Sequence, residues 1–223
     1  MKEKPTVVCG PHEEFMQEKV KHFFPLWITP NQITVARTLL LIPSILYLIY
    51  GQDFTSFTCR EIDVRNLIPA LICGVALYGD ALDGVLARAR GLCTPFGAVL
   101  DAMMDKVFII SYLLFMVIAE EYSEINYTIS IFFITIILLV ILIELVLGAV
   151  RIKDYFSFKQ GKKEGNELLA VKSGKLKLCL EAAGVIGLIL SYPTINIFGY
   201  VGLTCLFFSI IFASMSLISK ISR

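Results

Sequence analysis

Six long apolar stretches limit what this chain can fold into. Each has close to the roughly 20 residues that a helix needs to cross a bilayer, and each is continuously apolar, unlike the alternating strands of a membrane barrel. Apolar side chains make up 57% of the 223 residues, whereas a soluble domain usually has about 45–50%. The sequence therefore predicts an all-α integral membrane bundle of six transmembrane helices. The predicted helices lie near residues 32–51, 66–89, 97–119, 126–150, 175–192 and 196–218.

The basic residues are unevenly distributed between the connections. Most Lys and Arg lie before the first stretch, after the second and fourth stretches, and in the C-terminal tail, whereas the other loops carry only Arg60 and Arg65. Because Lys and Arg favour the cytoplasmic side of a membrane, we expect both termini to be cytoplasmic. The six cysteines form no CxxC pair and no cluster with histidine, so we expect neither a zinc site nor a disulfide framework.

Two regions are predicted along the chain, namely a cytoplasmic or interfacial N-terminal segment over residues 1–31 and a six-helix transmembrane domain over residues 32–223. The N-terminal segment is charged, but Phe15, Phe23 and Phe24 can share one face of a short helix. Such a helix would lie in the membrane interface or pack against the rest of the protein.

Two pairs of aspartates interrupt the second and third apolar stretches. Asp80 and Asp83 are three residues apart, and Asp101 and Asp105 are four apart. In helices these spacings place each pair on one face. Both pairs flank the short connection near residues 89–96, so a helical hairpin would bring the four carboxylates together at the cytoplasmic end of the bundle.

Carboxylates in a low-dielectric setting need a partner. Buried ionised groups are costly unless they are paired or bind metal, and oxygen ligands favour hard cations such as Mg²⁺ or Mn²⁺. Four carboxylates suit two bridged ions. The alternative is a structural ion-pair network with Arg88, Arg90 and Lys106. Gly84 and Gly97, beside the aspartates, would allow close approach of a ligand or of a packed helix.

The pattern Asp80-x2-Asp83-Gly84-x2-Ala87-Arg88-x8-Gly97-x3-Asp101-x3-Asp105 resembles the signature of the CDP-alcohol phosphotransferase family. The resemblance implies a six-span, homodimeric membrane enzyme that transfers a phosphatidyl group from CDP-diacylglycerol to an alcohol and releases CMP. Its partners would be those two substrates and the lipid bilayer, without nucleic acid, and its active site would face the cytoplasm.

The same resemblance implies roles for the residues of the pattern. Metal ions would be held by Asp80, Asp83, Asp101 and Asp105, and Asp105 would also be the catalytic base that takes the proton of the acceptor hydroxyl. The pocket for the CDP group would be formed by Asp80, Gly84, Ala87, Arg88 and Gly97.

The acceptor is predicted from a second group of residues. The segment from Thr29 to Arg37 is similar to the start of glycerophosphate phosphatidyltransferases of this family, and the order Glu144-x6-Arg151 partly resembles phosphatidylglycerophosphate synthases. A phosphorylated acceptor needs cations, so glycerol 3-phosphate is expected ahead of inositol phosphate, and phosphatidylglycerol, serine or another alcohol are the alternatives. The candidate acceptor-phosphate residues are Arg37, Arg151, Lys172, Lys175 and Lys177, which would otherwise be ordinary positive-inside anchors.

A different class of protein, a cation transporter, also places carboxylates inside a membrane. A transport pathway would need polar residues that continue toward the far side. The second and third stretches are instead almost wholly apolar away from the aspartates, at residues 67–77 and 107–118. The sequence thus favours a site that opens to one side only.

Overall fold

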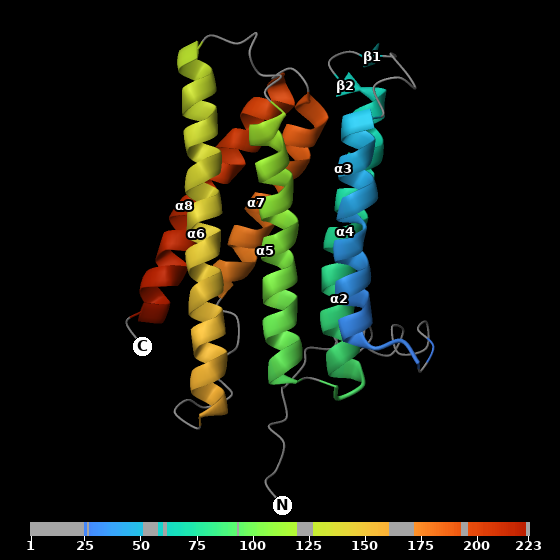
Figure 1. The fold of residues 1–223 in the computed structure, drawn as a ribbon, viewed down its shortest axis with the longest axis vertical. Coiled ribbons are helices and arrows are strands. Elements are labelled where there is room, and N and C mark those ends of the chain that lie inside the picture. Colours follow the sequence, from blue (N-terminus) through green and yellow to red (C-terminus); the bar gives the residue numbers. More distant parts are fainter. Residues whose placement is uncertain are drawn as a thin grey trace, which may run out of the picture.

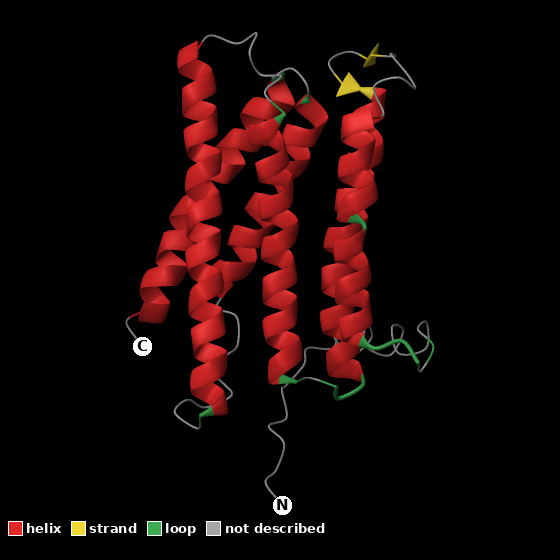
Figure 2. Ribbon diagram, in the orientation of Figure 1, coloured by secondary structure: helices red, strands yellow, loops and turns green. Residues whose placement is uncertain are grey.

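The computed structural model describes residues 25, 27–50, 58–59, 62–92, 94–119, 127–160, 172–192 and 196–221. In these residues the chain is almost entirely helical (Figure 2), so the predicted all-α fold is confirmed. Most of the predicted N-terminal segment, residues 1–24, lies outside the described residues. The helices are α2 (Pro30–Leu39), α3 (Leu41–Tyr50), α4 (Val64–Ala89), α5 (Pro95–Ile118), α6 (Tyr127–Lys159), α7 (Lys172–Ser191) and α8 (Ile197–Ile221).

The first predicted helix is divided into α2 and α3, which follow one another along a single rod (Figure 1). Only Leu40 separates them. Pro43, the third residue of α3, has no backbone N–H to donate to the preceding turn, and this weakens a helix at that turn. The Ser44 N–H still donates to the Leu40 carbonyl at 3.3 Å, so the rod continues.

Within the residues that the structure describes, four helical stretches are long and apolar enough to cross a membrane, judged by length and composition. They are Pro30–Tyr50, Asn66–Ala89, Ser130–Ser157 and Ile197–Ile218. These stretches indicate an integral, multi-pass membrane protein. The helices α5 and α7 carry charges within their apolar sequence, including Asp105 and Glu181. That all six helical rods cross the membrane, with α2 and α3 counted as one rod, therefore stays a prediction.

Two short strands precede α4. The strands β1 (Thr58–Cys59) and β2 (Ile62–Asp63) pair antiparallel, with Thr58 opposite Asp63. Figure 1 places them at the end of α4 remote from its C-terminus. The expectation that no strand crosses the membrane is consistent with this ladder, because each strand has only two residues.

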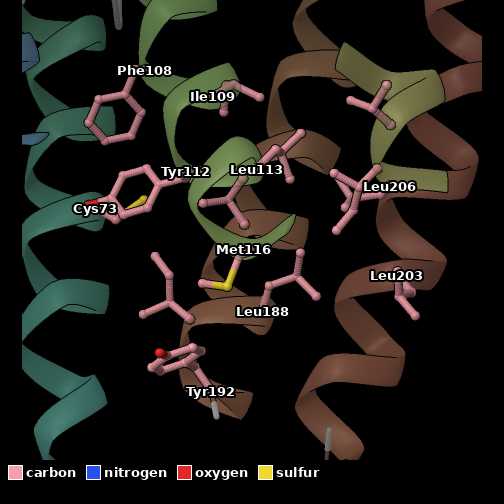
Figure 3. Close-up of a cluster of buried hydrophobic side chains, with 14 of the residues drawn as sticks. Cys73, Phe108, Ile109, Tyr112, Leu113, Met116, Leu188, Tyr192, Leu203 and Leu206 are labelled. Atoms are coloured by element: carbon pink, nitrogen blue, oxygen red, sulfur yellow. The ribbon is translucent and has the colours of Figure 1, made fainter. Parts of the chain in front are cut away.

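The apolar core lies around α5. Phe108, Tyr112 and Met116 follow one another at intervals of four residues, so they lie on one helix face, and each is 3% exposed or less. Figure 3 shows this face between Cys73 of α4 and Leu188 of α7. This packing ties α5 to α7, which also contacts α4, while α2 contacts both α4 and α5 near the aspartate pairs.

Glycines allow α7 and α8 to pack backbone against backbone. A Cβ atom added to Gly187 would lie 2.7 Å from the carbonyl oxygen of Phe198 and 2.9 Å from the Cα of Gly202. Side chains essentially never approach backbone this closely, and small residues are the usual solution where membrane helices cross tightly. The contact therefore requires glycine at position 187.

We expect Gly187→Ala to destabilise the protein by about 1–3 kcal/mol, because the added methyl meets backbone atoms that cannot rotate away. The measurement is the apparent Tm of the purified protein in detergent. Gly74→Ala in α4 is the matched control, since nothing lies within 4 Å of its added Cβ. Equal Tm values for the two variants would contradict the close packing.

Candidate active site

A tight connection turns the chain from α4 into α5. Gly91 has a φ of 64°, a conformation that favours glycine. The N–H of Leu92 donates to the carbonyl of Ala87 at 2.9 Å, which closes the end of α4. Thr94 then caps α5, since its hydroxyl accepts from the Gly97 N–H at 3.0 Å. The predicted hairpin is therefore present, and it brings the ends of α4 and α5 together.

The four aspartates meet around one arginine, Arg37. Its guanidinium nitrogens lie 2.8 Å from Asp80 Oδ1, 3.4 Å from Asp83 Oδ2, 2.7 Å from Asp101 Oδ1 and 2.8 Å from Asp105 Oδ1. The Arg37 side chain is only 6% exposed. Four carboxylates and one guanidinium carry a formal charge of −3 when all are ionised. The centre therefore remains strongly attractive to cations.

The position of Arg37 depends on close packing between α2 and α4. A Cβ atom on Gly79 would lie 3.5 Å from both Cβ and Cδ of Arg37, so the arginine stem passes directly over this glycine. One turn earlier in α2, the Thr34 hydroxyl donates to Asp83 Oδ2 at 2.7 Å. Thr34 was not among the predicted site residues. The available signal was its spacing of three residues from Arg37, which places both on one face of the helix.

The start of α2 is held by Arg90, which follows the end of α4. Arg90 Nη1 donates to the carbonyl of Ile28 at 2.7 Å, and Nη2 donates to the carbonyl of Pro25 at 3.1 Å. These contacts tie the segment before α2 to the α4–α5 connection. They therefore help to keep α2 in register with the aspartates.

Three of the aspartates have the geometry of a metal site. Asp80, Asp101 and Asp105 each offer one oxygen, and the three oxygens lie within 4.8 Å of one another. That limit is about twice a typical metal–oxygen distance of roughly 2.0–2.6 Å, so one hard cation fits between them. The closest contacts with Arg37 are made by Oδ1 of each of these carboxylates, and every carboxylate has a second oxygen that can ligate a metal ion. The residues therefore fit the predicted Mg²⁺ or Mn²⁺.

Exposure differs among the four carboxylates. The Asp101 side chain is 42% exposed, Asp80 is 23% and Asp105 is 20%, whereas Asp83 is 5%. Asp83 is also hydrogen-bonded to Thr34. The site is thus open at Asp101 and closed at Asp83, and the metal role of Asp83 stays a prediction.

The residues predicted to form the CDP pocket lie on both sides of this centre. A Cβ on Gly84 would lie 3.8 Å from Arg88 Nη1, so the guanidinium of Arg88 lies over the glycine. A Cβ on Gly97 would lie 3.1 Å from the Asn31 side-chain oxygen, so the start of α2 lies close to the start of α5. Ala87 occupies the last turn of α4. These roles stay predictions, although the surface beside the aspartates is built from small residues.

The structural alternative invoked Arg88, Arg90 and Lys106 as counter-ions. The ion pairs described for the aspartates are instead made by Arg37. Arg90 donates to backbone carbonyls, and Lys106 pairs with Glu144 on α6 at 2.9 Å. A counter-ion is therefore present, but it comes from α2 and not from the predicted residues of α4 and α5.

The five predicted acceptor-phosphate residues come from three helices, α2, α6 and α7, and those with described side chains have different surroundings. Arg37 lies among the aspartates, and Arg151 of α6 is half-buried, with its charge interacting with Asp154 and Asp101. Lys177 pairs instead with Glu144 and Glu181 in the interior. The remaining two, Lys172 and Lys175, belong to the first turn of α7, and their side chains lie outside the described part of the chain.

The chain is similar to known proteins over nearly all of these helices. Residues 27–215 match the CDP-alcohol phosphatidyltransferase family. Over 83 residues the chain is 36% identical to the archaetidylinositol phosphate synthase of Pyrococcus horikoshii, which covers 37% of each protein. Over 90 residues it is 31% identical to the CDP-diacylglycerol–glycerol-3-phosphate 3-phosphatidyltransferase of Bacillus subtilis, which covers 40% of this chain and 47% of that enzyme. The matched stretches thus span less than half of either relative. Because the family match itself covers most of the chain, this protein belongs to the CDP-alcohol phosphatidyltransferase family.

Proposed function

We propose that this protein transfers a phosphatidyl group from CDP-diacylglycerol to an alcohol and releases CMP. The observation that carries the proposal is the meeting of Asp80, Asp83, Asp101 and Asp105 at the α4–α5 hairpin of a chain in this family. The acceptor hydroxyl oxygen would attack the phosphorus that bears the diacylglycerol. The bond from that phosphorus to the bridging oxygen would break, CMP would leave with the electron pair, and the hydroxyl proton would pass to a base.

Asp105 is the proposed base. Its carboxylate lies 2.8 Å from Arg37 Nη1, and its side chain is partly exposed, so an acceptor can reach it within hydrogen-bonding distance. Asp80 and Asp101, with Asp83 behind them, are the proposed metal ligands. Bound Mg²⁺ or Mn²⁺, one or two ions, would supply positive charge that stabilises the reacting phosphates.

The donor would lie against the end of α4. Arg88 offers a planar, charged fork that suits phosphate, and Gly84, Ala87 and Gly97 leave room for the nucleotide beside it. The described residues of α4 and α5 farther from the hairpin, such as Cys73, Phe108 and Tyr112, are buried and apolar or aromatic. This supports a site that opens toward one end of the bundle and not a cation pathway through it.

Glycerol 3-phosphate is the acceptor that we propose, with inositol phosphate as the main alternative. Arg151 supports it, because this half-buried cation feels the charge of Asp101, the most exposed of the four aspartates, and a guanidinium suits an acceptor phosphate. Lys172 and Lys175 begin α7 and are proposed to contribute to the same basic region. The two curated relatives act on these two kinds of acceptor by their names, so the choice between them requires an assay.

We further propose that all six rods cross the membrane, with the N-terminus and the α4–α5 hairpin on the cytoplasmic side, and that the protein is a homodimer. The distribution of basic residues supports the orientation. A hairpin at the membrane surface would leave the lipid tails of the donor in the bilayer while a water-soluble acceptor enters from the cytoplasm.

The function is tested by following CMP release from CDP-diacylglycerol with Mg²⁺ or Mn²⁺ and a panel of acceptors: glycerol 3-phosphate, glycerol, inositol phosphate, serine and phosphatidylglycerol. We expect CMP release with glycerol 3-phosphate that requires the metal. No CMP with any acceptor would reject the transferase. CMP with inositol phosphate but not with glycerol 3-phosphate would reject only the acceptor.

For the acceptor site, we expect Arg151→Met to raise the KM for glycerol 3-phosphate by roughly tenfold, because it removes a charge-assisted hydrogen bond. The KM for CDP-diacylglycerol should change little. Lys153→Met, at an exposed position two residues later, is the matched control. A rise in KM for both substrates, or for neither, would argue against acceptor binding by Arg151.

A further inference from the structure

A second group of charges is buried beside the aspartates and is not used by the proposed chemistry. Lys106 Nζ lies 2.9 Å from Glu144 Oε2, Lys177 Nζ pairs with Glu144 Oε1, and Lys177 Nζ lies 3.3 Å from Glu181 Oε2. Side-chain exposure is 15% for Lys106, 9% for Lys177, 3% for Glu144 and 2% for Glu181. These four residues, the buried ion chain, connect α5 to α6 and α7.

Stability alone is a weak reason for burying four charges. The cost of removing charges from water often equals or exceeds the attraction between them, so apolar residues would serve the fold as well. The ion chain has two lysines and two glutamates, and its formal charge is zero. Together the four residues therefore exert little net electrostatic effect on their surroundings. Loss of any one of them would leave an uncompensated charge.

The ion chain begins next to the metal centre. Lys106 directly follows Asp105, and its charge acts on the Asp105 carboxylate. A cation at that position competes with Mg²⁺ or Mn²⁺ for the same negative field. Glu144 holds the ammonium group of Lys106 against α6 and neutralises it.

The Lys106 side chain packs against a glycine of α6 on its way to Glu144. Gly148 lies one turn after Glu144 in α6, and a Cβ atom there would lie 3.2 Å from Lys106 Cδ and 3.6 Å from Met103 Cε. That is tighter than most contacts of a real side chain. The absence of a side chain at position 148 thus lets the Lys106 stem lie along α6, directed to Glu144.

We propose that Glu144 is a positioning residue for the metal centre, which neutralises Lys106 and so keeps the divalent-cation affinity of the aspartates high. The inference rests on the metal site of the proposed function. It also gives Lys177 a role as a partner of Glu144 in place of the predicted contact with acceptor phosphate. Without Glu144, two buried lysines would share the single charge of Glu181, and the charge of Lys106 would act on the aspartates without a neutralising partner.

The test is direct Mn²⁺ binding to the metal-free, full-length protein in detergent, by calorimetry or by the Mn²⁺ paramagnetic resonance signal, without substrates. Glu144→Gln is expected to weaken Mn²⁺ binding roughly tenfold or more, as is usual when an outer partner of a metal site is lost. Lys106→Met/Glu144→Gln should restore the affinity to within about threefold of the wild type, because both the charge and its partner are gone. A double variant as weak as Glu144→Gln would overturn the proposal.

Two further variants separate positioning from simple structural support. Glu181→Gln removes a carboxylate that pairs with Lys177 and not directly with Lys106, so it should lower the apparent Tm while Mn²⁺ affinity stays within about twofold. Lys106→Met alone should bind Mn²⁺ at least as tightly as the wild type, which keeps the test decisive if Glu144→Gln does not fold. Weaker binding by Lys106→Met, or equal weakening by the two glutamate variants, would overturn the role of Glu144.

The outcomes also separate this inference from the function on which it rests. A wild-type protein that binds no Mn²⁺ would reject the metal site itself, and with it the proposed mechanism. A wild-type protein that binds Mn²⁺, together with a Glu144→Gln variant of equal affinity, would reject only the positioning role.

Discussion

Asp105→Asn is expected to lower kcat for CMP release by roughly 10³-fold or more, since a general base alone contributes about 10²–10⁴-fold and this residue also offers a metal ligand. The asparagine keeps the shape of the side chain but cannot accept the proton of the acceptor hydroxyl. The other carboxylates of the centre remain, so CDP-diacylglycerol binding should stay measurable. The measurement is CMP release at saturating substrates, together with ligand-induced stabilisation by CDP-diacylglycerol.

The comparison with Asp80→Asn shows which role of Asp105 dominates. Asp80 is proposed to hold metal and the CDP group, so its loss should weaken donor binding as well as turnover. If Asp105→Asn loses donor binding to the same degree, Asp105 is mainly a ligand and not the base. Asp63→Asn is the matched control, because it is the same substitution in β2, at the end of α4 remote from the hairpin.

Arg37→Met is expected to destabilise the metal-free protein by about 3 kcal/mol. This is the lower end of the cost of removing one partner from a buried ion pair. The guanidinium is nearly inaccessible and contacts all four carboxylates, so its removal makes the formal charge of the centre more negative, from −3 to −4. The lower end applies because Asp101 is partly exposed and water screens its charge. The measurement is the apparent Tm in detergent with a metal chelator.

Metal should reverse much of this loss. Adding Mn²⁺ supplies the positive charge that Arg37→Met removed, so the variant should gain more Tm from Mn²⁺ than the wild type gains. Arg37→Lys keeps the charge but loses the planar fork, and it should be intermediate. Arg88→Met is the matched control for an arginine near the same hairpin. A metal-free Arg37→Met protein as stable as the wild type would show that Arg37 does not hold the aspartates together.

The helices were largely predictable because hydrophobicity reports which residues avoid water. The third stretch, predicted at 97–119, corresponds to α5 over Pro95–Ile118. The fourth, predicted at 126–150, corresponds to α6, which continues to Lys159. Hydropathy marks where a helix leaves an apolar environment, and it does not mark where the backbone hydrogen bonding ends. The added residues of α6 are more polar and extend the helix past its apolar part.

The aspartate centre was also predictable, and for a geometric reason. Spacings of three and four residues place a pair on one helix face, and a connection of a few residues keeps the adjoining ends of two helices close together. Asp80, Asp83, Asp101 and Asp105 therefore had to meet once both segments were helical. Neither step required knowledge of distant parts of the chain.

The partners of those carboxylates could not be predicted in the same way. Arg37 is 64 residues away from Asp101 in sequence, and its position depends on the packing of α2 over Gly79. Lys106 and Lys177 were equally available by sequence, yet the fold directs both to Glu144. The sequence by itself determined the apolar helices and the meeting of the four aspartates, because both follow from local periodicity and one short connection. Only the tertiary structure decided which cation neutralises which carboxylate, because ion pairing acts over a few ångströms and depends on how separate helices pack.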